Sequence, residues 1–411
     1  MTKRNAMDLA LILAVSLAGL ALAGCAAHRE PLPIASPYRD PSDLEKGQIL
    51  HAATGRLLTE PELLEYLSHY PVVYVGEAHD SVDDHAVELK ILKSLEERFP
   101  GRVALGLEML RRPFQREVDA YIRGEMEEKE FLRVWQKNWG ANSFPYYQEI
   151  LRYAREKRIP VLALNAGDDL KKAVMEKGMD GLGPDLAAQL PEIDRDDPYY
   201  REFVEAFFGG HSKGSQHSDR FFQIQVLWDE TMAQAAAEYL LSPEGKGRRL
   251  AVFAGGNHVR YGFGIPRRLF RRVPVPFAIV NPHAPEIPEK KKDKIMDVSL
   301  PELPMRQADI YWIVGYEDLD DKRVMLGVEV AENPEGGVLI RGVMPDSPAA
   351  KAGVQKEDVI VAVDGAPVKE IFDLTYQVGL HAPGEQGSVE VQRQGERLTL
   401  PITFDVVRHG K

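Results

Sequence analysis

Six short apolar runs constrain the fold of this chain more than any other feature. They are rich in Val, Ile, Leu and Ala and do not alternate with polar residues, which is typical of parallel strands buried on both faces. The runs are Val72–Gly76, Val103–Glu108, Pro160–Asn165, Leu250–Gly255, Pro276–Asn281 and Ile310–Val314. The helical segments are Asp83–Phe99, with an apolar face of Ala86, Leu89, Leu92 and Leu95, and Pro145–Lys157. This order predicts an α/β domain with a mostly parallel sheet flanked by helices.

Polar residues stand where several of these strands are predicted to end. They are Glu77, His79, Glu108, Asn165, Asn257, His258 and Arg260. In an open parallel sheet the ligand crevice lies beyond the carboxyl ends of the strands, so these side chains should converge there. A single Gly-x-x-His turn is weak, because glycine permits a tight turn and the His can cap a helix. Two such turns with acidic neighbours favour a site, since a carboxylate beside an imidazole serves metal binding and acid–base chemistry alike.

Five stretches of the large domain, taken in order, form a more specific pattern. They read Val-Val-Tyr-Val-Gly-Glu-Ala-His-Asp (72–80), Ala-Leu-Gly-Leu-Glu-Met (104–109), Gln-Val-Leu-Trp-Asp-Glu-Thr-Met-Ala (225–233), Gly-Gly-Asn-His (255–258) and Ala-Asp-Ile-Tyr-Trp (308–312). This pattern resembles the ChaN-type haem-binding uptake lipoproteins and covers residues 46–317. That family is grouped with the TraB and Tiki proteins and the erythromycin esterases, which share the Gly-x-x-His pair but differ in chemistry.

The resemblance implies that the large domain binds haem, as a cofacial pair held between two protomers, and acts in haem or iron uptake. The implied haem-binding residues are His79, His258, Glu77, Glu108, Asn257, Arg260, His211 and Tyr261. It also implies that a Tyr ligates the iron and that basic residues of the partner protomer meet the propionates. The ligand matches no single position here, and the candidates are Tyr146, Tyr147, Tyr199, Tyr200 and Tyr261.

Two further segments of the large domain bear on this site. His211, Lys213 and His217 lie in a Gly/Ser-rich stretch that either closes over a ligand, pairing its cations with propionates, or is a solvated connector. Trp228 is expected in the core rather than against haem. The resemblance implies that the side chain of its neighbour, Asp229, points into the crevice.

The N-terminus has the form of a lipoprotein signal peptide. A positive start precedes an apolar run, Leu9–Ala23, that is too short to span a bilayer as a helix. The run leads into Leu-Ala-Gly-Cys, which resembles a lipobox, and Cys25 is the only cysteine of the chain. We therefore expect residues 1–24 to be removed, Cys25 to carry a lipid (palmitate) anchor, and residues 25–45 to form a flexible tether to the membrane. Because Ala26 and not Asp follows the Cys, the outer membrane is favoured for a Gram-negative source.

The composition excludes some classes of function. A formal net charge of −12 disfavours general nucleic-acid binding, which depends on Lys and Arg neutralising phosphates. One cysteine allows neither an internal disulfide nor a cysteine-based metal site. Any iron or other metal must therefore be held by N or O ligands.

A second, smaller domain is predicted from 324 to 405, where short strands alternate with Gly and Pro turns. Within it, Pro345–Gly353 predicts a short helix with Ser347 as N-cap and Pro348 at the first helical position. This region resembles a PDZ domain of the bacterial protease type. One departure is Glu357, where that pattern usually has Gly.

The PDZ resemblance implies a groove that takes an extended peptide by strand addition, with the peptide carboxylate on backbone N–H groups. The expected contacts are Leu326, Gly327 and Val328 in the carboxylate loop, and Leu374 in a helix over Ile371–Leu380. The alternative is a docking module that never binds a free C-terminus.

Three functions are open from the sequence. The first is a membrane-anchored haem-binding lipoprotein whose PDZ domain recruits a peptide or protein partner. The second is a hydrolase using Glu77, His79, Glu108 and His258, with or without a divalent metal, although the chain has neither Gly-x-Ser-x-Gly nor His-Glu-x-x-His. The third is an envelope scaffold in which the PDZ domain is the active part.

Overall fold

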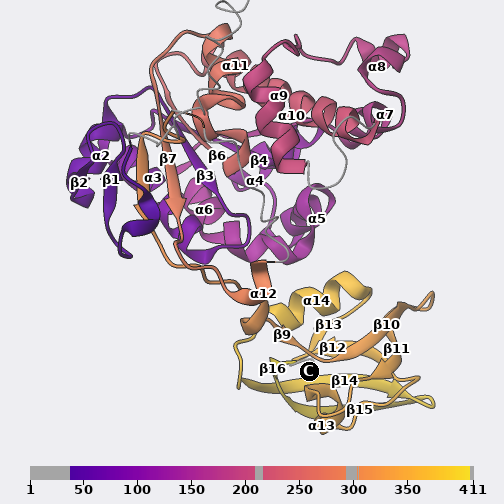
Figure 1. Ribbon diagram of the computed structural model, residues 1–411. Helices are drawn as coiled ribbons and strands as arrows, with labels where there is room; N and C mark the ends of the chain where they lie inside the picture. The colour runs from indigo at the N-terminus through magenta and orange to yellow at the C-terminus, as the bar shows by residue number, and fades with distance from the viewer. Residues whose placement is uncertain (1–37, 209–215, 293–302, 304, 408–411) are drawn as a thin grey trace, which may run out of the picture. The chain divides into compact units, whose positions relative to one another are not determined.

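The computed structural model describes residues 38–208, 216–292, 303 and 305–407, which form a large α/β domain and a small domain built mainly of strands (Figure 1). The predicted fold class is confirmed. The large domain has one eight-stranded sheet, in the order β2-β1-β8-β7-β3-β6-β4-β5. Its strands are β1 (Ile49–His51), β2 (Arg56–Leu58), β3 (Val72–Glu77), β4 (Val103–Arg111), β5 (Val161–Asn165), β6 (Arg249–Gly255), β7 (Phe277–His283) and β8 (Ile310–Ile313).

The six predicted strands are β3 to β8, and every pairing among them is parallel. The hairpin of β1 and β2 was not predicted; it adds to the edge of the sheet through an antiparallel pairing of β1 with β8. Each of these two strands has only three residues, too few to show a period in the sequence. The parallel strands bring their carboxyl ends to one edge of the sheet, which is where the candidate site lies.

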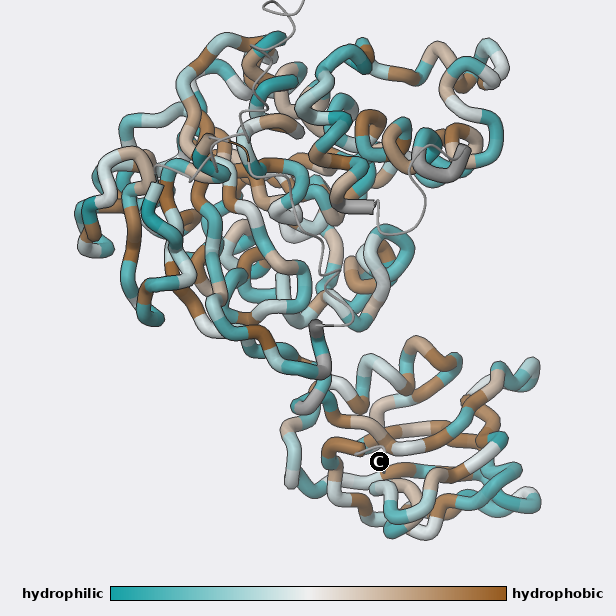
Figure 2. Tube along the Cα trace, in the orientation of Figure 1, coloured by the Kyte–Doolittle hydropathy of each residue, from teal (hydrophilic) through white to brown (hydrophobic). Residues whose placement is uncertain are grey.

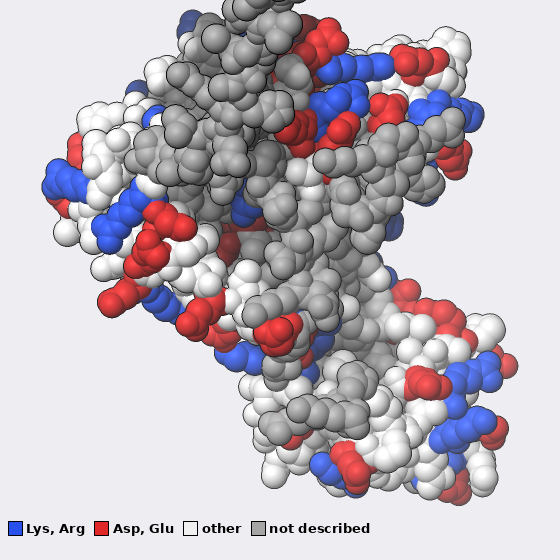
Figure 3. Space-filling view, in the orientation of Figure 1, with Lys and Arg blue, Asp and Glu red and all other residues white. Residues whose placement is uncertain are grey.

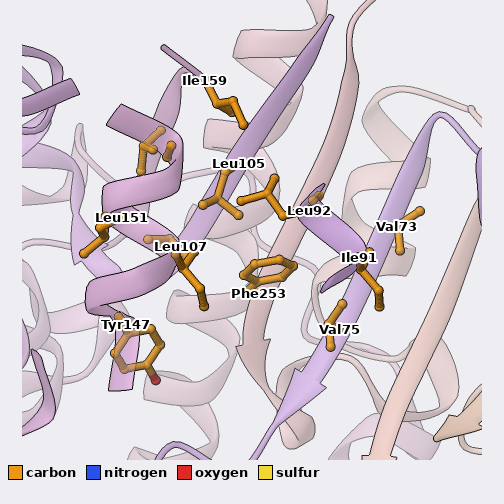
Figure 4. Packing of buried hydrophobic residues seen from close by; sticks show 14 of the residues in the cluster. Val73, Val75, Ile91, Leu92, Leu105, Leu107, Tyr147, Leu151, Ile159 and Phe253 are labelled. Carbon is orange, nitrogen blue, oxygen red and sulfur yellow. The ribbon is translucent and has the colours of Figure 1, made fainter. Parts of the chain in front are cut away.

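Helices lie on both faces of the sheet. The helices of the large domain are α2 (Glu60–Ser68), α3 (Val82–Arg98), α4 (Gln115–Arg123), α5 (Glu128–Trp139), α6 (Phe144–Lys157), α7 (Asp168–Lys177), α8 (Pro184–Ala187), α9 (Pro198–Phe208), α10 (Gln216–Leu241), α11 (Ile265–Arg272) and α12 (Glu289–Lys292). Val73 and Val75 of β3 pack in the cluster shown in Figure 4, with Ile91 of α3 and Leu151 of α6. The intervening Tyr74 packs on the other face with residues of α10. Both faces are therefore apolar, as the hydropathy along these strands shows (Figure 2).

The buried face of α3 differs from the predicted one. Ala86 is exposed and Leu89 is only partly buried. The buried residues of α3 are Asp84, His85, Val87, Glu88, Ile91, Leu92, Leu95 and Glu96. The first two turns therefore bury polar side chains, which hydropathy spacing alone does not predict because their partners come from another element.

The N-terminal predictions fall mostly outside the described residues, which begin at Tyr38. Cys25, residues 1–24 and most of the tether are not described. The folded domain begins before residue 46, because Asp40 caps a 3-10 helix over Pro41–Asp43 and Leu44 is buried in the cluster on the α10 face. In the described part of the chain, no helix is long and apolar enough to cross a membrane.

The small domain has the PDZ arrangement that its sequence predicts. Its elements are β9 (Val324–Met325), β10 (Val328–Glu332), β11 (Val338–Val343), α13 (Pro348–Ala352), β12 (Val359–Val363), β13 (Ala366–Pro367), α14 (Ile371–Gly379), β14 (Gln386–Arg393), β15 (Glu396–Thr403) and β16 (Asp405–Val406). The Ser347 hydroxyl accepts the Ala350 N–H at 3.2 Å, and Gly353 ends α13 in the left-handed region, as predicted. Strand β10 lies at the edge of the antiparallel sheet.

Glu357 carries a local backbone cost that a substitution can relieve. Its φ is +73°, in the left-handed region that disfavours residues with a Cβ by about 1–2 kcal/mol. We expect Glu357→Gly to raise the free energy of unfolding of the PDZ domain by about 0.5–1 kcal/mol, after the entropy that glycine loses on folding. Chemical denaturation, followed by a signal from the PDZ domain, measures this change in the free energy of unfolding. Glu335→Gly, in a turn at ordinary φ, should give no gain, and an equal gain there would refute the backbone explanation.

Candidate functional site

Two histidines and their carboxylates meet where β3 and β6 end, beside Glu108 of β4, which continues to Arg111. The register of β3 and β6 places Glu77 beside Gly255, and β4 brings Glu108 to the same edge. His79 and His258 follow β3 and β6 directly. The structure therefore brings together the four residues Glu77, His79, Glu108 and His258.

The first histidine is oriented by Glu77. His79 Nδ1 lies 2.6 Å from Glu77 Oε1, and the Tyr147 hydroxyl donates a hydrogen bond to the same oxygen. Trp139 packs its ring edge-on against the imidazole, with centroids 5.1 Å apart. Burial lowers the pKa of His79, but the charges of Glu108 and Glu77 outweigh this effect and raise it to about 9. The side chain is 40% exposed, so it is accessible to a ligand.

The second histidine is buried between two carboxylates. His258 Nδ1 lies 2.6 Å from Asp229 Oδ1, and its Nε2 lies 3.3 Å from Glu108 Oε1. The Tyr200 hydroxyl donates to Asp229, and the Gly255 N–H donates to Glu108 Oε2 at 2.7 Å. Burial lowers the pKa of His258, yet Glu108 and Asp229 raise it well above its usual value of 6.5.

The glycines of the two Gly-x-x-His turns permit close approach, not an unusual φ. A Cβ on Gly255 would lie 2.9 Å from His79 Nε2 and 3.5 Å from Glu108 Oε2. A Cβ on Gly76 would lie 2.6 Å from a Val259 methyl carbon and 3.1 Å from the Gly256 Cα. Neither Gly76 nor Gly255 has a positive φ. The turns can therefore pack against each other only if these positions have no side chain.

Arg260 adds a cation next to this cluster. Its guanidinium lies against Gly256, with Nε 3.1 Å from where a Cβ would stand, and Nε is buried without a hydrogen-bond partner. Within the described part of the chain Arg260 forms no ion pair, and burial lowers its pKa. Asn281 Oδ1 is a second buried atom without a partner here, and Asn257 is partly exposed in the turn.

The structure separates the five candidate tyrosines by what their hydroxyls bind. Tyr147 and Tyr200 donate to buried carboxylates, and the Tyr146 oxygen accepts the Leu319 N–H at 2.8 Å. Tyr199 on α9 is 60% exposed. Tyr261 is partly buried, has a φ of +58°, and stacks on Phe263 with centroids 5.4 Å apart.

The remaining predicted residues are placed as follows. His211 and Lys213 lie outside the described residues, and of His217 only the backbone, in the first turn of α10, is described. Trp228 is half-buried on the α10-face cluster and also meets the His258 ring edge-on at 6.1 Å. Asp229 is fully buried against His258.

Sequence reasoning missed the support behind the two histidines. Three residues were missed altogether: His85, Glu88 and Gln225, whose Nε2 lies 3.0 Å from His258 Nδ1. Tyr147 and Tyr200 were considered only as iron ligands, and their roles as hydrogen-bond donors to Glu77 and Asp229 were missed. The one available signal was the pair His85 and Glu88, three apart at the start of a helix that follows a Gly-x-x-His turn. Tyrosines far along the chain gave no such signal.

This arrangement suits histidines that donate protons or hydrogen bonds better than histidines that abstract protons as general bases. A general base works best with a pKa near the ambient pH and must be deprotonated. His79, with its pKa raised to about 9, is protonated near neutral pH, and the pKa of His258 is raised as well. The exposed His79 and Arg260 therefore offer cationic N–H groups at the strand ends, which suits an anionic ligand, whereas the charge of His258 is balanced by Asp229 and Glu108.

The PDZ groove has the expected local geometry. Gly327 has a φ of +74°, and a Cβ on it would lie 2.4 Å from the Ser347 Cβ. The Gly327 carbonyl accepts the Met344 N–H at 2.9 Å, which fixes the loop between β9 and β10. Leu374 of α14 is buried, and Val328 at the start of β10 is partly exposed.

The fold and the strand-end cluster define an α/β ligand-binding domain joined to a peptide-binding module. The family model described as "Haem-binding uptake, Tiki superfamily, ChaN" matches residues 63–269, about half of the chain, and the PDZ domain model matches residues 324–404. The chain belongs to this ChaN-like haem-binding family and carries a C-terminal PDZ domain.

Similar proteins cover the two domains separately. The protein RETICULATA-RELATED 5 of Arabidopsis thaliana chloroplasts is 26% identical over 231 residues, 51% of this chain and 30% of that protein. A probable periplasmic serine endoprotease, DegP-like, of Pseudomonas fulva is 42% identical over 66 residues, 16% of this chain and 14% of that protein. The chain thus spans less than a third of these curated relatives. The solved structure titled "Cofacial heme binding to ChaN of Campylobacter jejuni" is 17% identical, with a TM-score of 0.49, and covers 66% of this chain and 96% of that one.

Proposed function

We propose that the large domain binds haem at the strand-end cluster and that the PDZ domain binds the C-terminus of a partner. Membership of a haem-binding family supports the class of ligand. The observation that carries the site is Arg260, a partly buried residue whose Nε is buried without a hydrogen-bond partner and which forms no ion pair within the described residues. A charge buried without a partner costs several kcal/mol, so such a group is retained where a ligand supplies the counter-charge.

Cations at the strand ends would meet the propionates. Arg260 offers a planar, bidentate donor for a carboxylate, and the exposed His79 offers an N–H that stays protonated at neutral pH. Over the described part of the face in Figure 3, positive and negative side chains intermingle without a broad positive area. A dianionic ligand must therefore be held by individual cations such as Arg260 and His79, and not by a broad positive surface.

The remaining requirements of haem are an apolar surface and an axial ligand. Met175, Tyr199 and Phe221 expose apolar surface on the neighbouring helices α7, α9 and α10, which suits a flat macrocycle. Tyr199 and Tyr261 are the two candidate ligands whose hydroxyls are not committed to buried carboxylates or the backbone. Bound ferric haem would supply iron for tyrosinate ligation, and the protein would orient it through its propionates.

Titration of the purified, haem-free full chain with ferric haem tests this function. We expect a saturable shift of the Soret band at one or two haems per chain, and a dimer on size-exclusion chromatography with light scattering if two protomers share the haem. Tyr199→Phe or Tyr261→Phe should remove the tyrosinate charge-transfer band, whereas Tyr146→Phe should keep it. A Soret change that never saturates would refute specific binding.

Peptide binding by strand addition is supported by the free edge of β10 and by the fixed loop before it. We expect a peptide with a free carboxylate, selected from a C-terminal library, to lose binding at least 10-fold when that carboxylate is amidated. Gly327→Ala should weaken binding similarly, because the added Cβ meets Ser347 and the φ is unfavourable. Gly336→Ala also has a positive φ but open space around it, and it controls for backbone strain. Binding that ignores amidation would refute carboxylate recognition.

The lipid anchor and a role in haem or iron uptake complete the proposal. The anchor rests on the lipobox-like sequence that ends at Cys25, and the uptake role rests on membership of the haem-binding uptake family. Metabolic labelling with a palmitate analogue tests the anchor, and Cys25→Ser should abolish the label. Equal labelling of that variant would remove the anchoring proposal.

A further inference from the structure

A buried cluster of metal-ligating side chains lies behind the strand-end site. His85 and Glu88 of α3 face Glu77 of β3, and all three are at most 5% exposed. His85 Nδ1 lies 2.7 Å from Glu88 Oε2 and 3.6 Å from Glu77 Oε2. One nitrogen and two carboxylate oxygens of these residues lie within 4.8 Å of one another.

Two carboxylate oxygens of this cluster are buried and have no hydrogen-bond donor among the residues that the structure describes. They are Glu77 Oε2 and Glu88 Oε1. The other oxygen of Glu77 is already used by His79 and Tyr147. Leaving a buried carboxylate oxygen unsatisfied costs about 1–3 kcal/mol or more, so a positive species between these oxygens would stabilise the cluster. Burial and the neighbouring charge of Glu77 raise the pKa of Glu88, so that species is a proton shared by the two carboxyl groups or a metal ion that replaces it.

The second ring nitrogen of His85 fixes which atom faces the carboxylates. His85 Nε2 lies 3.3 Å from the backbone carbonyl oxygen of His79, which only accepts hydrogen bonds. With the proton on Nε2 this contact is a hydrogen bond, and the Nδ1 lone pair then points at the two carboxylates and can bind an ion. A histidine that binds a metal through one ring nitrogen usually donates the N–H of its other ring nitrogen to a carbonyl or carboxylate oxygen.

We propose that Glu77, His85 and Glu88 bind one divalent first-row transition-metal ion, separate from haem. The mixed imidazole and carboxylate set suits Mn, Fe, Co or Zn better than Ca or Mg, which take oxygen ligands. Glu77 then joins the two sites: one oxygen faces the ion and the other orients His79. This inference does not depend on haem binding.

Metal titration of the full chain tests the site. After dialysis against a chelator, the haem-free protein is titrated with Co²⁺, and bound metal is counted after gel filtration. We expect one ion per chain, and a loss of affinity of at least 10-fold in His85→Ala and Glu88→Gln. His69→Ala, which alters an exposed His–Glu pair on α2, is the matched control and should bind as the wild type does. Stoichiometric binding unaffected by both cluster variants, or no binding at 100-fold molar excess of ion, would overturn the proposal.

A second measurement needs no variant. X-ray absorption at the cobalt edge counts imidazole ligands, and the cluster supplies one, whereas an ion between His79 and His258 would have two. One imidazole with oxygen ligands supports the proposed site, and two imidazoles overturn it. Loss of the ion in His258→Gln together with retention in Glu88→Gln would also overturn it. Failure of the haem titration would leave all of these readouts unchanged.

Discussion

Asp229→Ala should lower the free energy of unfolding of the large domain by about 3–5 kcal/mol. Asp229 is fully buried and is the hydrogen-bond partner of both His258 Nδ1 and the Tyr200 hydroxyl. Its removal leaves a buried imidazolium with Glu108 alone and a buried phenol without an acceptor. Chemical denaturation followed by far-UV circular dichroism measures the change.

The matched control for this prediction is Asp219→Ala on the same helix. The Asp219 side chain is 53% exposed and forms a surface ion pair with Arg201, so the loss should stay within about 0.5 kcal/mol. Equal losses for the two variants would show that α10 tolerates neither change and that the buried pair has no special role.

The pH dependence of stability separates the charge effect from simple packing. A histidine whose pKa is raised on folding contributes stability that is fully present below its unfolded pKa of about 6.5 and is lost as the pH rises through its folded pKa. The wild type should therefore lose stability between pH 6.5 and about 9 through His79, and His258, whose pKa is also raised, adds to the loss above pH 6.5. Asp229→Ala should flatten this slope because it lowers the folded pKa of His258. An unchanged slope would contradict the assignment.

Arg260→Met should have opposite effects on stability and on haem binding. The guanidinium is desolvated and has no ion pair within the described residues, so a neutral side chain of similar length should raise the free energy of unfolding by about 1 kcal/mol. The same change removes a charge-assisted contact to a propionate, worth about 1.5–3 kcal/mol, and should weaken haem binding about 10–100-fold.

Arg98→Met at the end of α3 is the control for both measurements. Its side chain is 59% exposed and pairs with Glu65 on the surface, so neither stability nor haem affinity should change appreciably. If Arg260→Met kept full haem affinity while gaining stability, Arg260 would not be a propionate partner. If it lost stability, the guanidinium would have a partner within the fold.

Strand identity was predictable because it depends on local pattern. β3 and β6 are buried on both faces, so each reads as an unbroken apolar run whatever packs on it. The hairpin of β1 and β2 could not be predicted, because three-residue strands show no period and are fixed by pairing with β8. The PDZ helix was predictable because its cap, Ser347, and its stop, Gly353, are both encoded locally.

The sequence by itself determined the six parallel strands, the two Gly-x-x-His turns and the polar residues that follow them, since each depends on neighbours along the chain. Only the tertiary structure decided which residues support them. Asp229 and Tyr200 reach His258 across the fold, and the polar face of α3 is buried only because Glu77 lies opposite it. Burial of a polar group depends on a partner whose position the fold alone supplies. For the same reason the six apolar runs predicted the sheet, whereas the metal-ligating cluster behind it could be found only from the assembled structure.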